Sequence, residues 1–360
     1  MKNNFKISVI IPVYNSSIFI NRCLNTLIKK NFTKPFEVIF IDDGSTDNTI
    51  QIIKKKNLKN ISIFNLASNF GPSTARNIGI KHAKGEYIYF LDSDDTIEFN
   101  TLNKLYKTAK QKNYDIVFAD KKRIEKNKDQ RKKIFLYDKN KEFFKQDILK
   151  ELKKRFYEPL YMGGLIGCTG RLIKRSIIIK NKVFFNQKLR IREDDTFSWD
   201  IFSHVKKVKY VRKKLYSYYI NPNISTAISR GLTYNLSTSH YKLVIMPVKK
   251  TFKRLGLGRA EINRLSDQGF IYSIINSLIS ISRSILLCKI DLKNGIKIRK
   301  KFIKNIINDP DVIKSIKNYF ISFNESILIP KAISWKNLKI LELACDQRAK
   351  EILKLRRSIK

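Results

Sequence analysis

Apolar, β-branched runs alternate with segments of helical spacing through the first 120 residues of this chain. Five runs have the length and composition of buried strands: Lys6–Val13, Phe36–Ile41, Ile61–Leu66, Tyr87–Leu91 and Tyr114–Ala119. Between them, apolar residues recur every three or four positions, as in amphipathic helices. This alternation predicts an α/β fold with a Rossmann-like, mostly parallel sheet and helices on both faces. Ligands of such sheets bind beyond the carboxyl ends of the strands.

Polar residues follow three of these strands, at the edge where a ligand is expected. The first strand runs into Tyr14-Asn15, the second into Asp42-Asp43 and the fourth into Asp92-Ser93-Asp94-Asp95. Carboxylates this close repel each other, and a divalent cation held by one or two of them together with phosphate oxygens relieves the repulsion. The cluster therefore predicts a metal–diphosphate site. An acidic turn without a ligand is the alternative, because Asp favours turns.

The positive charge of the chain lies mainly behind this first part. The net charge is +42; residues 1–100 contain 13 Lys/Arg and 9 Asp/Glu, whereas residues 101–360 contain 60 and 22. The asymmetry indicates an anionic partner such as a membrane surface, a charged glycan or nucleic acid, unless it is only a compositional bias. A nucleic-acid surface would interleave aromatic and basic residues on one element, and none is evident, so no nucleic-acid partner is expected.

Other features limit the site chemistry and the location of the protein. Four scattered cysteines and three histidines give no zinc or disulfide pattern. The N-terminal apolar stretch is too short for a signal peptide and contains Pro12, which favours a cytoplasmic location. The segment Phe270–Cys288 contains Asn276 and Arg283, so it is expected to be a buried or interfacial helix instead of a membrane span. Residues 121–133 are expected to form an exposed connection.

Four segments, in this order, resemble the nucleotide-sugar-binding half of the family 2 glycosyltransferases, which have the GT-A fold. They are Ser8–Asn15 (SVIIPVYN), Ile41–Asp47 (IDDGSTD), Asn69–Gly79 (NFGPSTARNIG) and Gly85–Asp95 (GEYIYFLDSDD). Farther on, Glu193–Phe197 (EDDTF) is similar to the E-D-x-x-F element of these enzymes, and Tyr218–Thr226 loosely resembles the segment that closes the catalytic domain. The resemblance implies a nucleotide-sugar-binding half over residues 1–120 and an acceptor-binding, catalytic half over 121–231. Residues 232–360 form a helical, basic C-terminal region without a recognised motif.

The resemblance implies a role for each matching residue. Pro12 and Tyr14 would line the base pocket, and Asp43, or else Asp42, would accept a hydrogen bond from the base, which favours uracil. Arg76 would approach the base or the diphosphate. Asp92, Ser93 and Asp94 form the D-x-D element, in which Asp92 would contact the ribose or the sugar and both carboxylates would hold Mn²⁺ or Mg²⁺, chiefly through Asp94. Asp194 stands at the general-base position with Glu193 beside it, but Asp195 adds a third carboxylate and leaves the choice open. Gly163–Gly170 is expected to be an acceptor-side loop.

The activity implied is that of an inverting, metal-dependent hexosyltransferase. It would move a sugar from UDP-hexose or UDP-N-acetylhexosamine to a hydroxyl of a bacterial surface glycan, such as a capsule, a lipo-oligosaccharide or a related polymer. A basic helix around Ile296–Ile307 suggests a peripheral position on anionic lipid at the inner face of the plasma membrane, although a helix packed on a core by its apolar face fits the same pattern. Transfer to a polyprenyl-phosphate carrier is one alternative, and a non-enzymatic nucleic-acid-binding protein is the other. The oligomeric state is left open.

Overall fold

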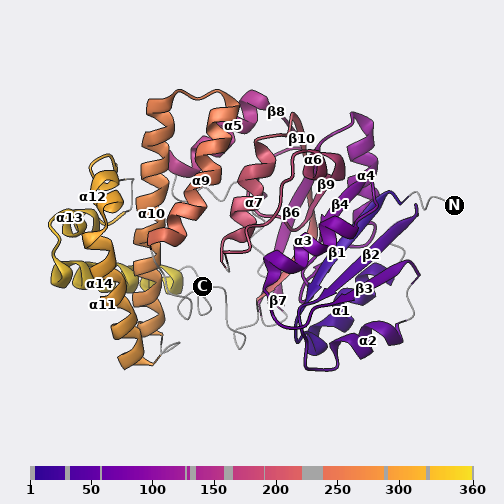
Figure 1. The fold of residues 1–360 in the computed structure, drawn as a ribbon, viewed down its shortest axis with the longest axis horizontal. Helices are drawn as coiled ribbons and strands as arrows, with labels where there is room; N and C mark the ends of the chain where they lie inside the picture. The colour runs from indigo at the N-terminus through magenta and orange to yellow at the C-terminus, as the bar shows by residue number, and fades with distance from the viewer. Residues whose placement is uncertain are drawn as a thin grey trace. The chain divides into compact units, whose positions relative to one another are not determined.

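The computed structural model describes residues 5–28, 33–56, 59–125, 128–129, 135–157, 165–189, 191–220, 238–287, 291–321 and 325–358. The chain divides into two compact units (Figure 1). Unit 1 comprises Met1–Glu151 and Met162–Asn221, and unit 2 comprises Leu152–Tyr161 and Pro222–Lys360. The predicted combination of an α/β sheet with a mainly helical C-terminal region is confirmed.

Unit 1 is built on a mixed sheet whose main strand order is β3-β2-β1-β4-β9-β6-β10-β5. The strands are β1 (Ile7–Val13), β2 (Phe36–Asp42), β3 (Ile61–Asn65), β4 (Tyr87–Phe90), β5 (Thr96–Ile97), β6 (Ile116–Glu125), β7 (Lys128–Asp129), β8 (Lys141–Phe144), β9 (Arg171–Lys174) and β10 (Lys207–Ile220). Strands β3, β2, β1 and β4 are parallel, as predicted. Strand β9 is antiparallel to both β4 and β6 and separates them, so the fifth predicted strand does not lie beside the fourth.

Helices cover both faces of the sheet. One face packs its apolar side chains against α1 (Ser17–Ile28), α2 (Thr49–Lys55) and α4 (Thr101–Gln111). The other carries α3 (Pro72–His82), which has a proline in its first turn, and α7 (Glu193–Phe202). Two further helices are α5 (Lys145–Tyr157) and α6 (Arg175–Lys180). The acidic turn after β4 thus follows a strand that is buried along its whole length.

The prediction of an exposed connection over residues 121–133 is wrong for residues 121–125, which belong to β6. β6 continues to Glu125 and pairs in parallel with β10, and Lys128–Asp129 forms the short β7. Residues 126–127 and 130–133 lie outside the described residues. A run of five mostly charged residues gave no strand signal, because its pairing is with a strand more than 80 positions away along the chain.

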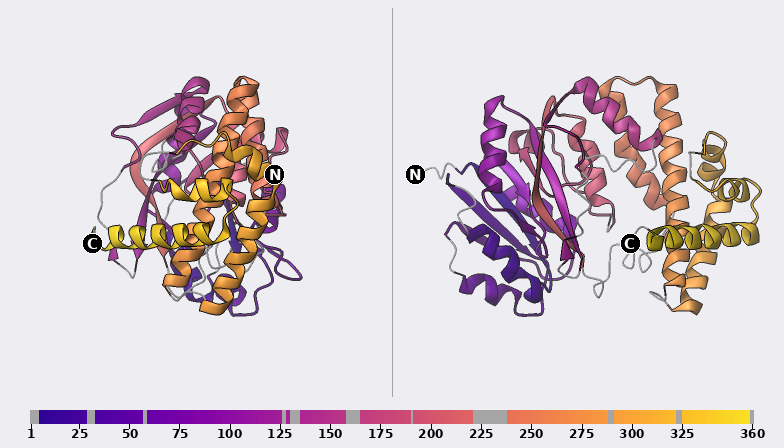
Figure 2. Two further views of the ribbon diagram at one scale, coloured as in Figure 1. Left: turned by 90° about the vertical axis from the view of Figure 1, so that its left-hand side faces the viewer. Right: turned by 180° about the vertical axis from the view of Figure 1, so that it is seen from behind.

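Unit 2 is helical. Its helices after α5 are α9 (Thr238–Leu255), α10 (Arg259–Leu286), α11 (Leu292–Asn308), α12 (Pro310–Ile316), α13 (Leu328–Ser334) and α14 (Leu338–Ser358). The long α10 packs against α9, α11, α12 and α14, and Figure 2 shows it beside α11 and α14. Within the described part of the chain, α10 alone is long and apolar enough to cross a membrane, and 56% of its apolar window is buried. Its apolar residues belong to the core of unit 2, together with Phe302, Ile303, Ile306 and Ile307 of α11.

Gly85 lies so close to β1 that no larger residue fits at its position. A Cβ at residue 85 would lie 2.5 Å from the backbone nitrogen of Ser8 on β1, while the Gly85 N–H donates to Ser8 Oγ at 2.8 Å. Gly85→Ala is therefore expected to lower the free energy of unfolding by about 1–3 kcal/mol, as measured by urea denaturation. Gly258→Ala is the control, since a Cβ there meets nothing within 4 Å. Equal midpoints for the two variants would contradict the prediction.

Candidate active site at the carboxyl edge of the sheet

The ends of β1 and β2 are locked together by side chains. Asn15, in the left-handed conformation at φ 45°, accepts a hydrogen bond from the Thr46 N–H at 2.8 Å, and its own N–H donates to Ser45 Oγ at 3.0 Å. The Ser45 N–H donates to Asp42 Oδ1 at 3.0 Å. Tyr14 stands at this edge with 47% of its surface exposed, so its ring is accessible to a planar ligand. Pro12 is partly exposed just before it.

Asp43 is buried, and both of its carboxylate oxygens accept backbone hydrogen bonds. Phe70 N–H donates to Oδ1 and Gly71 N–H donates to Oδ2, each at 2.8 Å. The next residue, Gly44, has φ +79°, and a Cβ there would lie 2.9 Å from the carbonyl carbon of Ser68. Asp43 therefore holds the loop that leads into α3. Asp42, the alternative base contact, lies beside it and is 6% exposed.

Residues 92–95, here called the acid turn, are held by Ser16 and by Arg22 of α1. Ser93 Oγ lies 2.8 Å from Ser16 Oγ, and the Arg22 guanidinium donates to the Asp94 carbonyl oxygen at 2.5 Å. The same guanidinium lies 3.5 Å from the centre of the Tyr219 ring. Asp92 and Asp94 remain partly exposed. The turn therefore presents these two carboxylates at a fixed position.

Asp95, the last residue of the acid turn, has a structural role that we did not predict. It is fully buried, and its carboxylate accepts from the Tyr216 hydroxyl at 2.6 Å and the Tyr219 N–H at 2.9 Å. A register shift in β10 between Lys214 and Tyr216 precedes these contacts and changes which residues face the turn. Burial, and then the charges of Asp92 and Asp94, raise the pKa of Asp95 to about 8. The only sequence signal for Asp95 was its place in the cluster.

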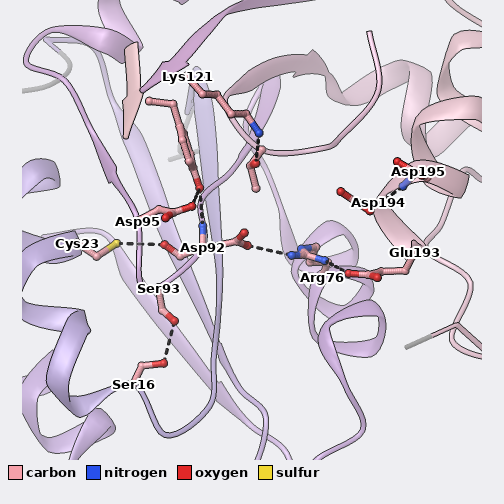
Figure 3. A network of polar contacts seen from close by, with 12 residues as sticks. Ser16, Cys23, Arg76, Asp92, Ser93, Asp95, Lys121, Glu193, Asp194 and Asp195 are labelled. Carbon is pink, nitrogen blue, oxygen red and sulfur yellow. Dashed lines mark hydrogen bonds and ion pairs between the residues drawn. The ribbon is translucent and has the colours of Figure 1, made fainter. Parts of the chain in front are cut away.

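Arg76 joins the two acidic elements of the site. It lies on α3, is 6% exposed, and bridges Asp92 Oδ1 at 2.9 Å and Glu193 Oε1 at 3.0 Å (Figure 3). Burial opposes its charge, but Cys168 and the two carboxylates outweigh burial and raise the pKa of Arg76 well above its usual value. Residues 117 positions apart are thereby fixed side by side. The approach of Arg76 to a base or diphosphate stays a prediction.

The three carboxylates at the start of α7 have different surroundings. Glu193 pairs with Arg76, and Asp195 Oδ2 accepts from Arg192 Nε at 3.1 Å. Asp194 Oδ1 accepts the Asp195 N–H at 2.8 Å. Burial, and then Asp195 and Glu193, raise the pKa of Asp194 to about 7. Of the three, Asp194 therefore has the environment that suits a general base at neutral pH.

Aromatic packing fixes the helix that carries these carboxylates. Phe197, one turn after Glu193, stacks on Phe185 with ring centres 4.1 Å apart and meets Phe90 of β4 edge to face at 5.7 Å. The phenylalanine of the E-D-x-x-F pattern thus ties α7 to the strand that leads into the acid turn. Trp199 is also buried.

The described part of the glycine-rich loop, residues 165–170, borders Asp194. A Cβ at Gly167 would lie 4.0 Å from Asp194 Oδ2, and the Gly167 N–H donates to Ser198 Oγ at 2.9 Å. Gly163 and Gly164 lie outside the described residues, and so does the Tyr218–Thr226 segment beyond Ile220. Gly167 therefore brings the loop close to the carboxylate of Asp194 without placing a side chain against it.

Two further side chains lie at this loop, and sequence reasoning assigned neither of them a role. Lys121, from the run expected to be a connection, donates to Thr169 Oγ1 at 2.7 Å. Surrounding protein atoms, and then Arg171, lower the pKa of Lys121. Cys168 is buried, and burial raises the pKa of its thiol to about 12, so it is not a thiolate nucleophile at neutral pH. Lys121 stands in no motif, whereas Cys168 stands in the predicted glycine-rich loop Gly163–Gly170 without a signal that distinguishes it from its neighbours.

The donor set fits a hard divalent cation that is shared with a ligand. Among the described residues, no group of three or more His, Cys, Asp and Glu side chains is placed to hold a metal by itself. Asp92 and Asp94 supply two partly exposed carboxylates, and Mg²⁺ is commonly bound through one or two carboxylates plus phosphates. The remaining ligands would have to come from a bound diphosphate and water.

Comparison with known proteins places the chain in a family. The family model described as glycosyl transferase family 2 matches residues 8–179. The chain is 32% identical over 240 residues to the poly(ribitol-phosphate) beta-N-acetylglucosaminyltransferase TarP of Staphylococcus aureus (strain N315), which covers 65% of this chain and 68% of TarP. It is 30% identical over 219 residues to the poly(ribitol-phosphate) beta-N-acetylglucosaminyltransferase TarS of S. aureus (strain Mu50 / ATCC 700699), and the match covers 59% of this chain and 35% of TarS. The chain spans about a third of the length of the first curated relatives that it matches.

A solved structure supports the fold. The crystal structure of S. aureus TarS 1-349 in complex with UDP superposes with a TM-score of 0.67 at 20% identity, covering 96% of this chain and 92% of that one. The predicted GT-A fold is thereby confirmed. The similarity extends beyond the nucleotide-sugar-binding half, since nearly the whole chain is covered.

Proposed function

The chain belongs to glycosyl transferase family 2, and from this premise we propose that it transfers a sugar from a UDP-sugar to a hydroxyl group of an anionic surface polymer. The observation that carries the proposal is the pair of ion pairs made by Arg76, which connect the acid turn to Glu193 beside Asp194. A leaving-group site and a base site are then neighbours, as a direct displacement requires.

In the proposed reaction, Asp194 takes the proton of the acceptor hydroxyl. The acceptor oxygen forms a bond to the anomeric carbon, the bond from that carbon to the diphosphate oxygen breaks, and UDP leaves. A single displacement inverts the anomeric centre. A carboxylate with a pKa of about 7 is a stronger base than an ordinary aspartate and is still largely ionised above neutral pH.

The donor would occupy the edge formed by β1, β2 and the acid turn. Tyr14 would stack on the base, and Asp42 or Asp43 would accept its imide hydrogen bond. Asp92 and Asp94 would hold Mn²⁺ or Mg²⁺, which when bound would neutralise negative charge on the diphosphate. Arg76 would keep Asp92 and Glu193 in place.

The acceptor and the location are inferred from relatives and charge. TarP and TarS are poly(ribitol-phosphate) beta-N-acetylglucosaminyltransferases, and their acceptor is a polymer with regular negative charge. Residues 222–360 of this chain contain 27 Lys/Arg and 9 Asp/Glu, which favours a polyanionic acceptor and also contact with anionic lipid at the cytoplasmic face of a membrane. Transfer to a polyprenyl phosphate is the second candidate acceptor reaction.

A thermal-shift experiment with UDP, GDP, CDP and AMP, each with and without Mn²⁺, tests the donor site. We expect UDP to raise the melting temperature only when Mn²⁺ is present, because a ligand of the native state stabilises it by mass action. Asp94→Asn should abolish the Mn²⁺-dependent rise in melting temperature. Asp311→Asn, which replaces an exposed carboxylate of unit 2, should leave this rise unchanged. A melting temperature that no nucleotide changes would contradict the proposal and favour salt-dependent nucleic-acid binding.

A further inference from the structure

A groove of about 330 Å³ lies within unit 2, a size typical of small-ligand sites. It is formed by residues of α9, α10 and α12 and by Asn318, and α9 and α12 both pack against α10. Its apolar lining is Ile245, Met246 and Phe270, of which Met246 is 63% exposed. Polar and charged side chains make up the rest: Lys242, Lys249, Asn263, Ser266, Asp267, Asp311, Lys314, Ser315 and Asn318.

The two acidic residues of the groove are already occupied. Asp267 accepts from Ser315 Oγ and Asn318 Nδ2, each at 2.8 Å. Asp311 Oδ2 pairs with Lys242 Nζ at 2.6 Å. An incoming cation would therefore have to displace internal partners, which makes the groove unsuitable for a cationic ligand.

Two lysines of the groove have no such partner. Within the described residues, Lys249 and Lys314 are exposed and take part in no ion pair or hydrogen bond. They stand on different helices, α9 and α12, each of which packs against α10. An anionic group could be bound here at little cost, because the lysines would give up only water.

Ser266 supplies an independent observation that points to a ligand. It lines the groove and is 1% exposed, yet its hydroxyl has no hydrogen-bond partner in the part of the chain that the structure describes. A buried hydroxyl without a partner is costly and needs an explanation. Asn263, an exposed amide that also lines the groove, lies one turn before Ser266 on the same helix.

We propose that this groove binds a segment of the anionic polyol-phosphate acceptor, with Lys249 and Lys314 on phosphodiester groups and Ser266 and Asn263 on hydroxyl groups. The apolar lining would contact the carbon backbone between them. The choice of polymer rests on the proposed function, whereas the site itself does not use any residue of unit 1. Such a site would hold the acceptor on the enzyme between transfers and raise its effective concentration.

The test is binding of a synthetic, fluorescently labelled oligo(ribitol phosphate) to the full chain without UDP. Lys249→Glu/Lys314→Glu is expected to weaken binding at least about tenfold, the loss expected for two charge-assisted contacts. The control Lys301→Glu/Lys304→Glu changes the same charge on exposed positions of α11, and it should change the affinity less than about twofold. Equal losses in the two double variants would show a non-specific charge effect and overturn the proposal.

Ser266→Ala separates a ligand contact from a structural one. If the hydroxyl serves the ligand, alanine should weaken oligomer binding severalfold and leave the melting temperature unchanged or raised, because a buried unpartnered group is removed. A lowered melting temperature with unchanged affinity would contradict the proposal.

Binding to phosphatidylglycerol vesicles distinguishes a lipid ligand of the groove from the polymer, and the response to UDP distinguishes this proposal from the proposed function. Vesicle binding should be equal in the groove and control variants; a loss of vesicle binding alone in the groove variant would assign the groove to lipid and overturn the proposal. The Mn²⁺-dependent rise in melting temperature with UDP should persist in the groove variant. If the wild-type protein binds the oligomer through the groove but its melting temperature never changes with UDP, the proposed function is wrong and the proposal of a polymer-binding groove stands.

Discussion

Replacing Asp194 with asparagine is expected to lower kcat for sugar transfer about 10³-fold while UDP still raises the melting temperature. Asparagine keeps the shape of the side chain but cannot accept a proton, and general-base catalysis is worth about 10²–10⁴ in rate. Asp195→Asn is the matched control, because Asp195 is the neighbouring carboxylate and is paired with Arg192. A larger loss in Asp195→Asn than in Asp194→Asn would assign the base to Asp195.

The pH profile gives the same assignment a second test. Asp194 must be ionised to act as a base, and burial with two neighbouring carboxylates raises its pKa to about 7. Transfer by the wild-type protein should therefore rise with pH through about 7 and level off above it. The residual activity of Asp194→Asn should lack this rise. A wild-type rate that is constant from pH 5 to pH 8 would contradict a base with a raised pKa.

Removing Arg76 is expected to cause the largest loss of stability in unit 1. Its guanidinium is almost fully buried and neutralises two carboxylates, so Arg76→Met would leave Asp92 and Glu193 without their cation. The cost of leaving a buried charge unpaired is about 3–5 kcal/mol, and it should come mainly from Glu193, whose side chain is 12% exposed, because that of Asp92 is 31% exposed. The loss should appear in urea denaturation. Transfer should also fall by about 10²-fold or more, because both acidic elements lose their position.

Two further variants identify the cause of that loss. Lys110→Met breaks the exposed ion pair with Glu86 in the same unit and should cost at most about 1 kcal/mol. Arg76→Met/Glu193→Gln should recover part of the stability of Arg76→Met, since one unpaired charge is then absent. A double variant that is less stable than Arg76→Met would show that the effect comes from lost packing.

Much of the parallel half of unit 1 could be predicted from local patterns. Runs such as Lys6–Val13 and Tyr87–Leu91 are apolar throughout because both faces of a central strand are covered, and this leaves a clear signal. Strand β9 gave none, since it has four residues and begins and ends with a basic one. β6 was predicted only to Ala119, because its continuation is charged and is stabilised by pairing with β10.

Local patterns likewise predicted some residues of the candidate site and gave no signal for others. Asp92, Asp94, Glu193 and Asp194 stand in recognisable motifs, and the structure brings their two elements together through Arg76. Asp43 was predicted to accept a hydrogen bond from the base. Both its oxygens also hold the loop before α3, which no local pattern indicated, and its contact with a base stays a prediction. Tyr216 and Lys121 reach the site through the pairing of β6 with β10, which no local pattern encodes. The distinction among the three carboxylates of α7 depends on partners that only the folded chain supplies.

The anchoring of the acid turn has a consequence for how donor preference can change between related enzymes. Ser16, Arg22 and Tyr216 fix Ser93, Asp94 and Asp95, and none of them is a predicted contact of the base. The side chains predicted to surround the base, such as Tyr14 and Asp42, can therefore be exchanged without moving the carboxylates that we propose hold the metal. We expect descendants of such a scaffold to acquire new nucleotide preferences by drift at the base pocket, while the diphosphate geometry is inherited unchanged.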